Sequence, residues 1–215
     1  MKKYCILLLF VFMGLKGFTQ GISFTVFAEP QLGWFSPNSK NIEAAGSMIG
    51  FNGGVNFDNF FAENYAFSTG VSINNINGKV KYQKPSTLEG LDSTYIINSG
   101  DVVEYHMQYI NIPIGLKFKT IEIGYTRFYA HLGMDANINI KAKANIPYEE
   151  NIDAANEMHW YNLGYYIGGG LEYSLGGTTA IVAGLTYKNG FLDITTAENN
   201  KITTGNLSLR LGILF

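Results

Sequence analysis

The last ten residues of the chain alternate between two kinds of side chain. Five of them are apolar and occupy every second position: Leu207, Leu209, Leu211, Ile213 and Phe215. The positions between them are polar or small, apart from Leu214: Asn206, Ser208, Arg210 and Gly212. A repeat of two residues places neighbouring side chains on opposite faces of a β-strand. The decapeptide therefore predicts a strand whose two faces meet different surroundings.

Apolar residues are abundant in the chain but never cluster into a helix-length run. The chain is 47% apolar and 14% aromatic and contains 25 glycines. After residue 20, no stretch reaches the roughly 18 continuous apolar residues of a membrane helix. Apolar residues that are spread over every second position are typical of a transmembrane β-barrel, with its apolar face toward lipid. A soluble lipocalin-like barrel is the rival fold, and it predicts apolar residues that point inward.

Eight alternating segments follow one another, each near the roughly 9 to 11 residues that a tilted membrane strand needs. We expect strands at residues 22–34, 49–57, 65–73, 104–118, 124–138, 159–173, 179–194 and 206–215. Pro30 lies inside the first, so we expect a bulge there or a place where its missing N–H is tolerated. We interpret residues 74–102 as a long loop or a strand extension beyond the membrane, and residues 141–158 and 198–201 as loops. These alternate with short connections, as in outer-membrane barrels. The predicted fold is all-β, a transmembrane antiparallel up-and-down β-barrel of about eight strands.

The N-terminus has the pattern of a secretory signal peptide. Lys2 and Lys3 precede an apolar stretch over residues 4–15, and residues 17–20 form the expected cleavage region. We therefore expect residues 1–20 to be a cleaved signal peptide and residues 21–215 to be an outer-membrane β-barrel domain. The single cysteine, Cys5, lies inside the apolar stretch. The exported chain would then carry no thiol and no disulfide.

Charge and motifs argue against several classes of function. Without Lys2, Lys3 and Lys16, the 15 basic residues fall to 12 against 17 acidic ones, and no basic run occurs, so nucleic acid is not an expected partner. The three histidines show no metal-ligand spacing, and the glycines at 168–170 are not followed by the residues of a phosphate loop. No nucleophile motif is present. We therefore expect no enzyme, no catalytic residue, no cofactor and no metal site.

Some alternatives remain open at this point. An outer-membrane enzyme of the lipid-modifying or protease type would need a cluster of catalytic residues at the loop rim. Aromatic residues near the predicted strand ends are expected at the membrane interface, with sugar stacking as the alternative. Glu149, Glu150 and Asp153 could bind a divalent cation, although solvated loop charge is the favoured interpretation.

Four stretches carry a resemblance to a known family: residues 108–118 (QYINIPIGLKF), 164–173 (GYYIGGGLEY), 185–194 (LTYKNGFLDI) and the terminal LGILF. Together they resemble the outer-membrane β-barrel domain of the Bacteroidetes, the PorT-like or "porin family" barrel. The resemblance implies the barrel fold and a location in the cell outer membrane. The terminal aromatic also resembles the C-terminal assembly signal of such barrels, carried here by Leu209, Leu211, Ile213 and Phe215. The resemblance implies that outer-membrane lipid and the barrel assembly machinery are partners of the protein.

Charged residues on the polar faces of the predicted strands suggest what fills the barrel. They are Glu29, Lys117, Asp135, Glu172 and Arg210. An eight-stranded barrel is just wide enough for side chains to fill its interior, and a lone buried charge costs several kcal/mol. We therefore expect an ion-pair and tyrosine network, with Arg210 near Glu29 where the last strand closes against the first, and Glu172 two strands away. Abundant glycines on these faces would make room for the bulky side chains.

The sequence thus favours a structural or interaction barrel whose lumen is filled by side chains and whose extracellular loops bind a partner. The alternative is a small channel or a ligand-binding barrel for a small solute.

Overall fold

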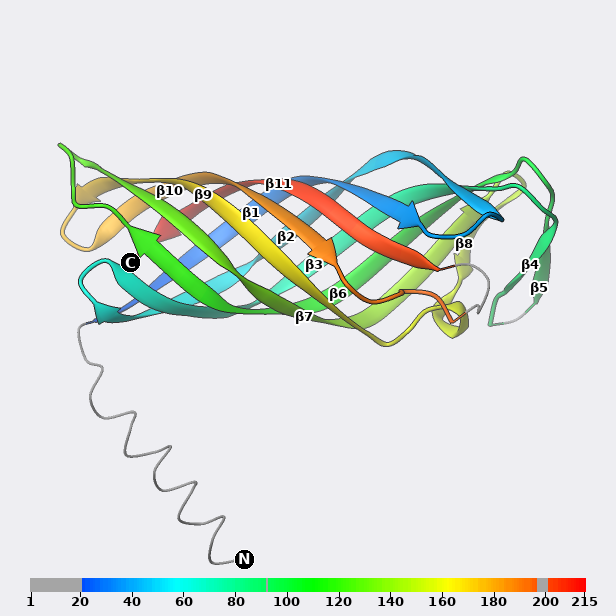
Figure 1. Ribbon diagram of the computed structural model, residues 1–215, viewed down its shortest axis with the longest axis horizontal. Helices are drawn as coiled ribbons and strands as arrows, with labels where there is room; N and C mark the ends of the chain where they lie inside the picture. Colours follow the sequence, from blue (N-terminus) through cyan, green and yellow to red (C-terminus); the bar gives the residue numbers. More distant parts are fainter. Residues whose placement is uncertain (1–20, 92, 197–200) are drawn as a thin grey trace, which may run out of the picture.

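The computed structural model describes residues 21–91, 93–196 and 201–215, and the predicted signal peptide lies outside these residues. Eight long strands form one closed antiparallel ring (Figure 1). They are β1 (Ile22–Pro37), β2 (Ile42–Ala62), β3 (Tyr65–Tyr82), β6 (Val102–Lys119), β7 (Thr126–Ile146), β9 (Tyr161–Gly176), β10 (Thr179–Gly190) and β11 (Ile202–Leu214). Each pairs with the next along the chain, and β11 pairs with β1 to close the ring. The predicted up-and-down barrel of about eight strands is confirmed.

The two ends of the barrel differ in the length of their connections. One end carries four short elements: β4 (Ser86–Glu89), β5 (Thr94–Ile97), β8 (Glu149–Asp153) and the 3₁₀-helix η2 (Ala155–Glu157). We call it the loop end; it lies at the right of Figure 1. The opposite turn end holds the connections at residues 63–64, 120–125 and 177–178, together with the C-terminus. Outer-membrane barrels place long loops outside the cell and short turns in the periplasm, and the two ends of this barrel differ in the same way. The described residues contain no helix that is long and apolar enough to cross a membrane.

The side chains of the strands alternate between the outside and the lumen as predicted. Along β1, Phe24, Val26 and Leu32 are exposed on the outer face. Between them, Thr25 and Glu29 are buried in the lumen. Apolar outside and polar inside is the pattern of a membrane barrel and is opposite to that of the soluble rival.

Pro30 points outward and needs no bulge. The β1–β11 ladder pairs Ala28 with Leu211 and Gln31 with Ser208, and it contains no pair for Glu29 and Pro30. The register is the same on both sides of this gap. The missing N–H of proline is therefore tolerated by a local break in one ladder.

Several strands extend further than the sequence predicted. β2 begins at Ile42 and ends at Ala62, β3 continues to Tyr82, and β7 continues to Ile146. Residues 58–62 and 141–146, predicted to lie in connections, are therefore strand, and residues 74–82 are a strand extension rather than a loop. The outer faces of residues 74–82 and 141–146 are polar, which reflects strands that have left the membrane, since lipid no longer selects apolar residues there.

Candidate functional site

The interior of the barrel is the candidate site, because the sequence places its charges there. Its middle part contains four acidic side chains and four basic ones, so their formal charges cancel. Each takes part in an ion pair with another member of the set: Glu29, Asp58, Asp135, Glu172, Lys117, Lys119, Lys188 and Arg210.

The first group joins the strands at the barrel seam. Arg210 on β11 donates from Nε to Glu29 Oε1 on β1 at 2.5 Å. Glu29 Oε2 accepts a hydrogen bond from Asn52 Nδ2 at 2.6 Å, and Asn52 is the direct β2 partner of Glu29. The Arg210 guanidinium lies 4.4 Å from the centre of the Phe27 ring. Glu29 is fully buried, so its charge depends on these partners.

The second group spans strands that are not neighbours. Lys117 on β6 lies 2.6 Å from Asp58 Oδ2 on β2 and 2.8 Å from Glu172 Oε1 on β9. Glu172 Oε2 also lies 2.9 Å from Lys119 Nζ. Asp58 Oδ1 accepts a hydrogen bond from Ser68 at 2.6 Å. Lys117 thus bridges two carboxylates across the lumen.

The third group lies around Asp135 on β7. Lys188 Nζ on β10 is 3.7 Å from Asp135 Oδ2 and donates to Asn111 Oδ1 at 3.1 Å. Asn111 Nδ2 donates to Asp135 Oδ2 at 3.0 Å and to Asn137 Oδ1 at 2.9 Å. A cavity of about 10 Å³ lies beside this group, which is about the space of one water molecule.

The five charged residues named from the sequence therefore fall into three groups and not one network. Arg210 lies against Glu29, and Lys117 lies against Glu172. Glu172, expected two strands away from Arg210, takes its cations from β6 and has no ion pair with Arg210. Asp135 pairs with neither basic residue of the predicted set.

Sequence reasoning missed Asp58, Lys119 and Lys188. Asp58 was placed in a connection because β2 was predicted to end at residue 57, and Lys119 was placed in a turn. Lys188 shares the inward parity of Thr186 on β10, so the alternation itself could have identified it.

Glycines on the lumen face make room for aromatic side chains. A Cβ on Gly115 or Gly133 would lie 2.4 or 2.8 Å from the hydroxyl of Tyr166. A Cβ on Gly184 would lie 2.4 Å from the hydroxyl of Tyr129. A Cβ on Gly115 or Gly133 would also lie 2.3 Å from a backbone oxygen of the neighbouring strand, so glycine is required where the tyrosine crosses the lumen.

Toward the loop end the lumen becomes apolar. A buried cluster, which we call the loop-end core, is built from residues of the strand extensions and the loops: Phe35, Ile42, Ile76, Val80, Tyr82, Leu88, Ile97, Val103, Tyr105, Met107, Tyr109, Ala142, Ala144, Ile146, Ile152, Ala154, Met158, Ile194 and Ile202. Leu88 and Ile97 come from the β4–β5 hairpin and are fully buried. The hairpin therefore caps the barrel by packing into its mouth.

A hydrogen bond ties the cap to η2. Glu157 Oε1 accepts from the backbone N–H of Glu89 at 2.6 Å. Burial raises the pKa of the Glu157 carboxyl, and the hydrogen bond from Glu89 opposes this rise.

The turn end is open, in contrast to the loop end. A cavity of about 920 Å³ lies there, lined by Phe24, Arg127, Ser174 and Phe215 among others. Lys119 and Glu172 also line it, so the second ion-pair group borders the cavity on the lumen side.

The predicted assembly-signal residues lie where the alternation places them. Leu209, Leu211 and Ile213 are exposed on the outer face of β11. Phe215 follows the strand and stacks on Phe24 of β1, with ring centroids 5.0 Å apart. Both aromatic rings thus lie at the turn end, where β1 pairs with β11.

Comparison with known proteins gives a family and a set of similar structures. No curated protein sequence matches the chain. The neisserial surface protein A structure covers 91% of this chain and 98% of its own at 15% identity, with a TM-score of 0.48. The structure of the outer membrane protein OprG from Pseudomonas aeruginosa covers 90% of this chain and 94% of its own at 13% identity, with a TM-score of 0.48. The structure of Ail, the attachment invasion locus protein of Yersinia pestis, covers 90% of this chain and 97% of its own at 14% identity, with a TM-score of 0.42.

The family model for the outer membrane protein beta-barrel domain matches residues 16–196, which is most of the chain. This match agrees with the closed ring of eight strands, its apolar outer face and its paired interior charges. The chain therefore belongs to the outer membrane protein beta-barrel domain family.

Proposed function

We propose that this protein is a closed, non-conducting barrel that presents its loop end at the cell surface as an interaction platform. The observation that carries the proposal is the burial of lumen side chains at successive levels. Ser208 and Asn111 in the polar middle are each only 1% exposed, and Leu88 in the loop-end core is 0% exposed. Water hardly reaches these side chains, which supports a lumen that is obstructed at several levels.

The packed cap supports the interaction role. The β4–β5 hairpin buries Leu88 and Ile97, and its two strands pair with each other. Glu157 of η2 accepts a hydrogen bond from the hairpin. Large apolar side chains remain exposed on the hairpin and on the neighbouring loops: Leu91, Ile96, Tyr148 and Trp160. These side chains are the ones that we propose contact a partner, since aromatic residues are enriched in protein interfaces.

The proposal includes the finer expectations from the sequence. These are export by a cleaved signal peptide over residues 1–20, kinship with the PorT-like barrels, no catalytic role, and recognition of Leu209, Leu211, Ile213 and Phe215 by the assembly machinery. The terminal Phe215 supports the last of these, because it is exposed at the periplasmic rim beside the barrel seam.

The runner-up is a barrel that holds a small ligand at its periplasmic mouth. The turn-end cavity favours it, since about 920 Å³ is large enough for a small organic molecule. Such a ligand would meet Lys119 and Glu172 on the lumen side of the cavity and would not pass through.

Single-channel recording in planar bilayers tests the proposal against a conducting role. We expect no sustained current steps from the purified, folded protein, because the ion-pair groups and the loop-end core obstruct the lumen. A general porin inserted under the same conditions serves as the positive control. Protein recovered from the bilayer vesicles should migrate differently on a gel before and after heating, which shows that it is folded. Sustained steps of regular size would establish the channel alternative instead.

A further inference from the structure

The outer face of the barrel is not uniform at the loop-side edge of its apolar band. Across β3, β6 and β7 the band reaches Ile73, Ile110 and Ile138, which are register partners, and on β7 it ends with the exposed Ile140 at the register shift. On β1 and β10, on the other side of the barrel, Trp34 and Tyr187 follow the apolar positions.

The β1–β10 side carries an aromatic belt. The ring of Trp34 lies 6.2 Å from that of Tyr187, Tyr187 lies 6.3 Å from Tyr165, and Tyr165 lies 5.3 Å from Phe191. Aromatic rings of this kind anchor a barrel at the level of the lipid headgroups. Among the described residues, the next outward positions on β1, β10 and β11 are Ser36, Asn189 and Thr203, which carry no charge.

The β3–β6–β7 side carries cations and amides in place of rings. Its outward residues beyond the apolar band form what we call the basic patch: Asn75, Asn77, Lys79 and Lys81 on β3, His106 and Gln108 on β6, and Lys141 and Lys143 on β7. A register shift opposite Gln108 and Tyr109 pairs Gln108 with Lys141. This shift gives Lys141 and Lys143 the same outward parity as His106.

The side chains at the centre of the patch lie close together. His106 is the direct cross-strand partner of Lys143, and Gln108 is that of Lys141. Directly opposite residues have Cβ atoms about 5 Å apart, and diagonal ones about 7–8 Å apart. Lys141, Lys143 and His106 are therefore neighbours on the outer face. Their side chains are long enough to contact the same anion.

The acids near the patch leave its centre positively charged. At the β2 edge of the patch, Lys79 forms an ion pair with Glu104, and Glu43 on β2 is the cross-strand partner of Lys81. Asp153 on β8 is the cross-strand partner of Lys143, whose Nζ instead donates to the neutral Asn151 amide at 3.0 Å. Within the described part of the chain, no carboxylate lies within 4 Å of the Lys141 ammonium, and this side chain is exposed.

We propose that the basic patch binds the phosphate of a phosphorylated glycolipid in the outer leaflet of the outer membrane. The patch follows the apolar band along each of its three strands, so it lies at the depth of the lipid headgroups. Lysines at a membrane surface attract anionic headgroups, and ammonium groups bind phosphate as compact point charges. The aromatic belt would then anchor one side of the barrel while bound lipid phosphate anchors the other.

The test measures binding of diphosphoryl lipid A to the full barrel by native mass spectrometry from detergent, with the dephosphorylated lipid as the second arm. We expect clear preference for the phosphorylated lipid. Lys141→Gln together with Lys143→Gln should weaken its binding roughly thirtyfold, because each lysine near an anionic lipid surface contributes about a factor of five. Lys141→Arg with Lys143→Arg should retain binding, because the charges are kept.

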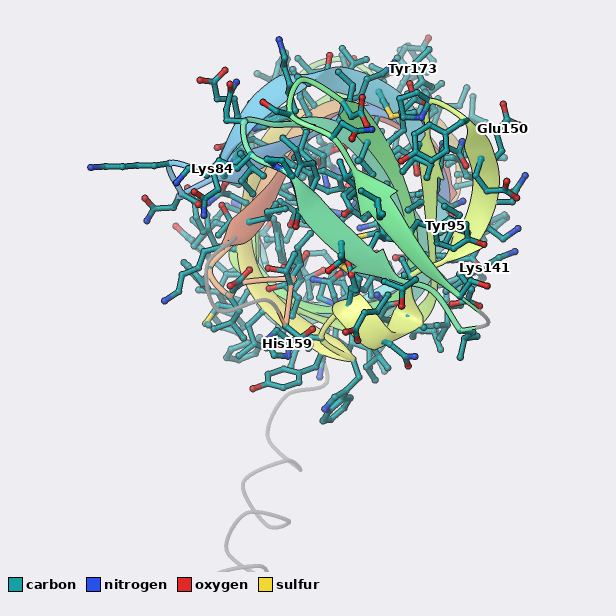
Figure 2. All side chains as sticks on the ribbon, turned by 90° about the vertical axis from the view of Figure 1, so that its right-hand side faces the viewer. Lys84, Tyr95, Lys141, Glu150, His159 and Tyr173 are labelled. Carbon is teal, nitrogen blue, oxygen red and sulfur yellow. The ribbon has the colours of Figure 1, made fainter. Side chains whose placement is uncertain are left out.

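The matched control is Lys40→Gln with Lys84→Gln, which removes the same charge from two other exposed lysines. Figure 2 shows Lys84 and Lys141 on opposite sides of the loop end. This control should bind the phosphorylated lipid as the wild type does. Three results would overturn the proposal: equal binding of both lipids, equal losses in the two glutamine pairs, or displacement of the lipid by millimolar inorganic phosphate.

Discussion

Replacing Arg210 with leucine should lower the free energy of unfolding by about 3–5 kcal/mol, the usual cost of removing one partner of a buried ion pair. The substitution leaves the Glu29 carboxylate fully buried, with the Asn52 amide as its remaining partner. It also removes the guanidinium from the face of Phe27. Urea titration of the barrel in lipid vesicles, followed by tryptophan fluorescence, measures the loss.

Two controls make this result specific. Adding Glu29→Gln to Arg210→Leu should recover much of the stability, because glutamine is neutral and still accepts from Asn52. Arg127→Leu should change the free energy of unfolding by only about 0–1 kcal/mol, because its pair with Glu122 is solvent-exposed. If Arg210→Leu unfolded at the same urea concentration as Arg127→Leu, the seam pair would contribute nothing to closure.

Lys117→Met should have an effect of similar size, about 3–5 kcal/mol. Methionine keeps the length of the side chain but removes the ammonium that lies between Asp58 and Glu172. Glu172 retains Lys119, so Asp58 is the acid left without a cation. The same urea titration measures the loss.

Glu172 has a second cation and Asp58 does not, so the two acids should differ in how well their neutral variants restore stability. Asp58→Asn in the Lys117→Met background should restore stability, whereas Glu172→Gln should restore less. Lys79→Met, which breaks a half-exposed pair with Glu104, should cost about 1 kcal/mol or less. Rescue by Glu172→Gln and not by Asp58→Asn would mean that Lys117 serves the other carboxylate.

The sequence predicts the barrel well because its repeat of two residues is imposed by the membrane. Lipid favours apolar residues at the outward positions of the strands, so the pattern reveals both the strands and their faces. The pairing of Arg210 with Glu29 could also be predicted, because closure of an up-and-down barrel brings the last strand beside the first. The strand pattern and the Arg210–Glu29 pair could be predicted because they involve residues close in the sequence or on strands that must be neighbours in the barrel.

The cross-lumen groups could not be predicted in the same way. Lys117 reaches β2 and β9, which are not hydrogen-bonded to β6, so its partners depend on the stagger of the strands and on the space left by glycines. The loop-end core was hidden for a different reason. Residues 74–102 are polar overall, but Ile76, Val80, Leu88 and Ile97 all point into the barrel mouth. Their apolar character shows only once the strand extensions and the hairpin are known.

The reactivity of single cysteines measures whether side chains fill the lumen. The only native cysteine is Cys5, so the barrel domain provides a background without thiols. Ser208→Cys places a thiol in the buried middle of the lumen, and Ser174→Cys places one in the lining of the turn-end cavity. With a charged methanethiosulfonate reagent, Ser208→Cys should react at least roughly a hundredfold more slowly than Ser174→Cys, because reaction requires opening of the packed interior. Equal rates at the two positions would contradict a closed barrel.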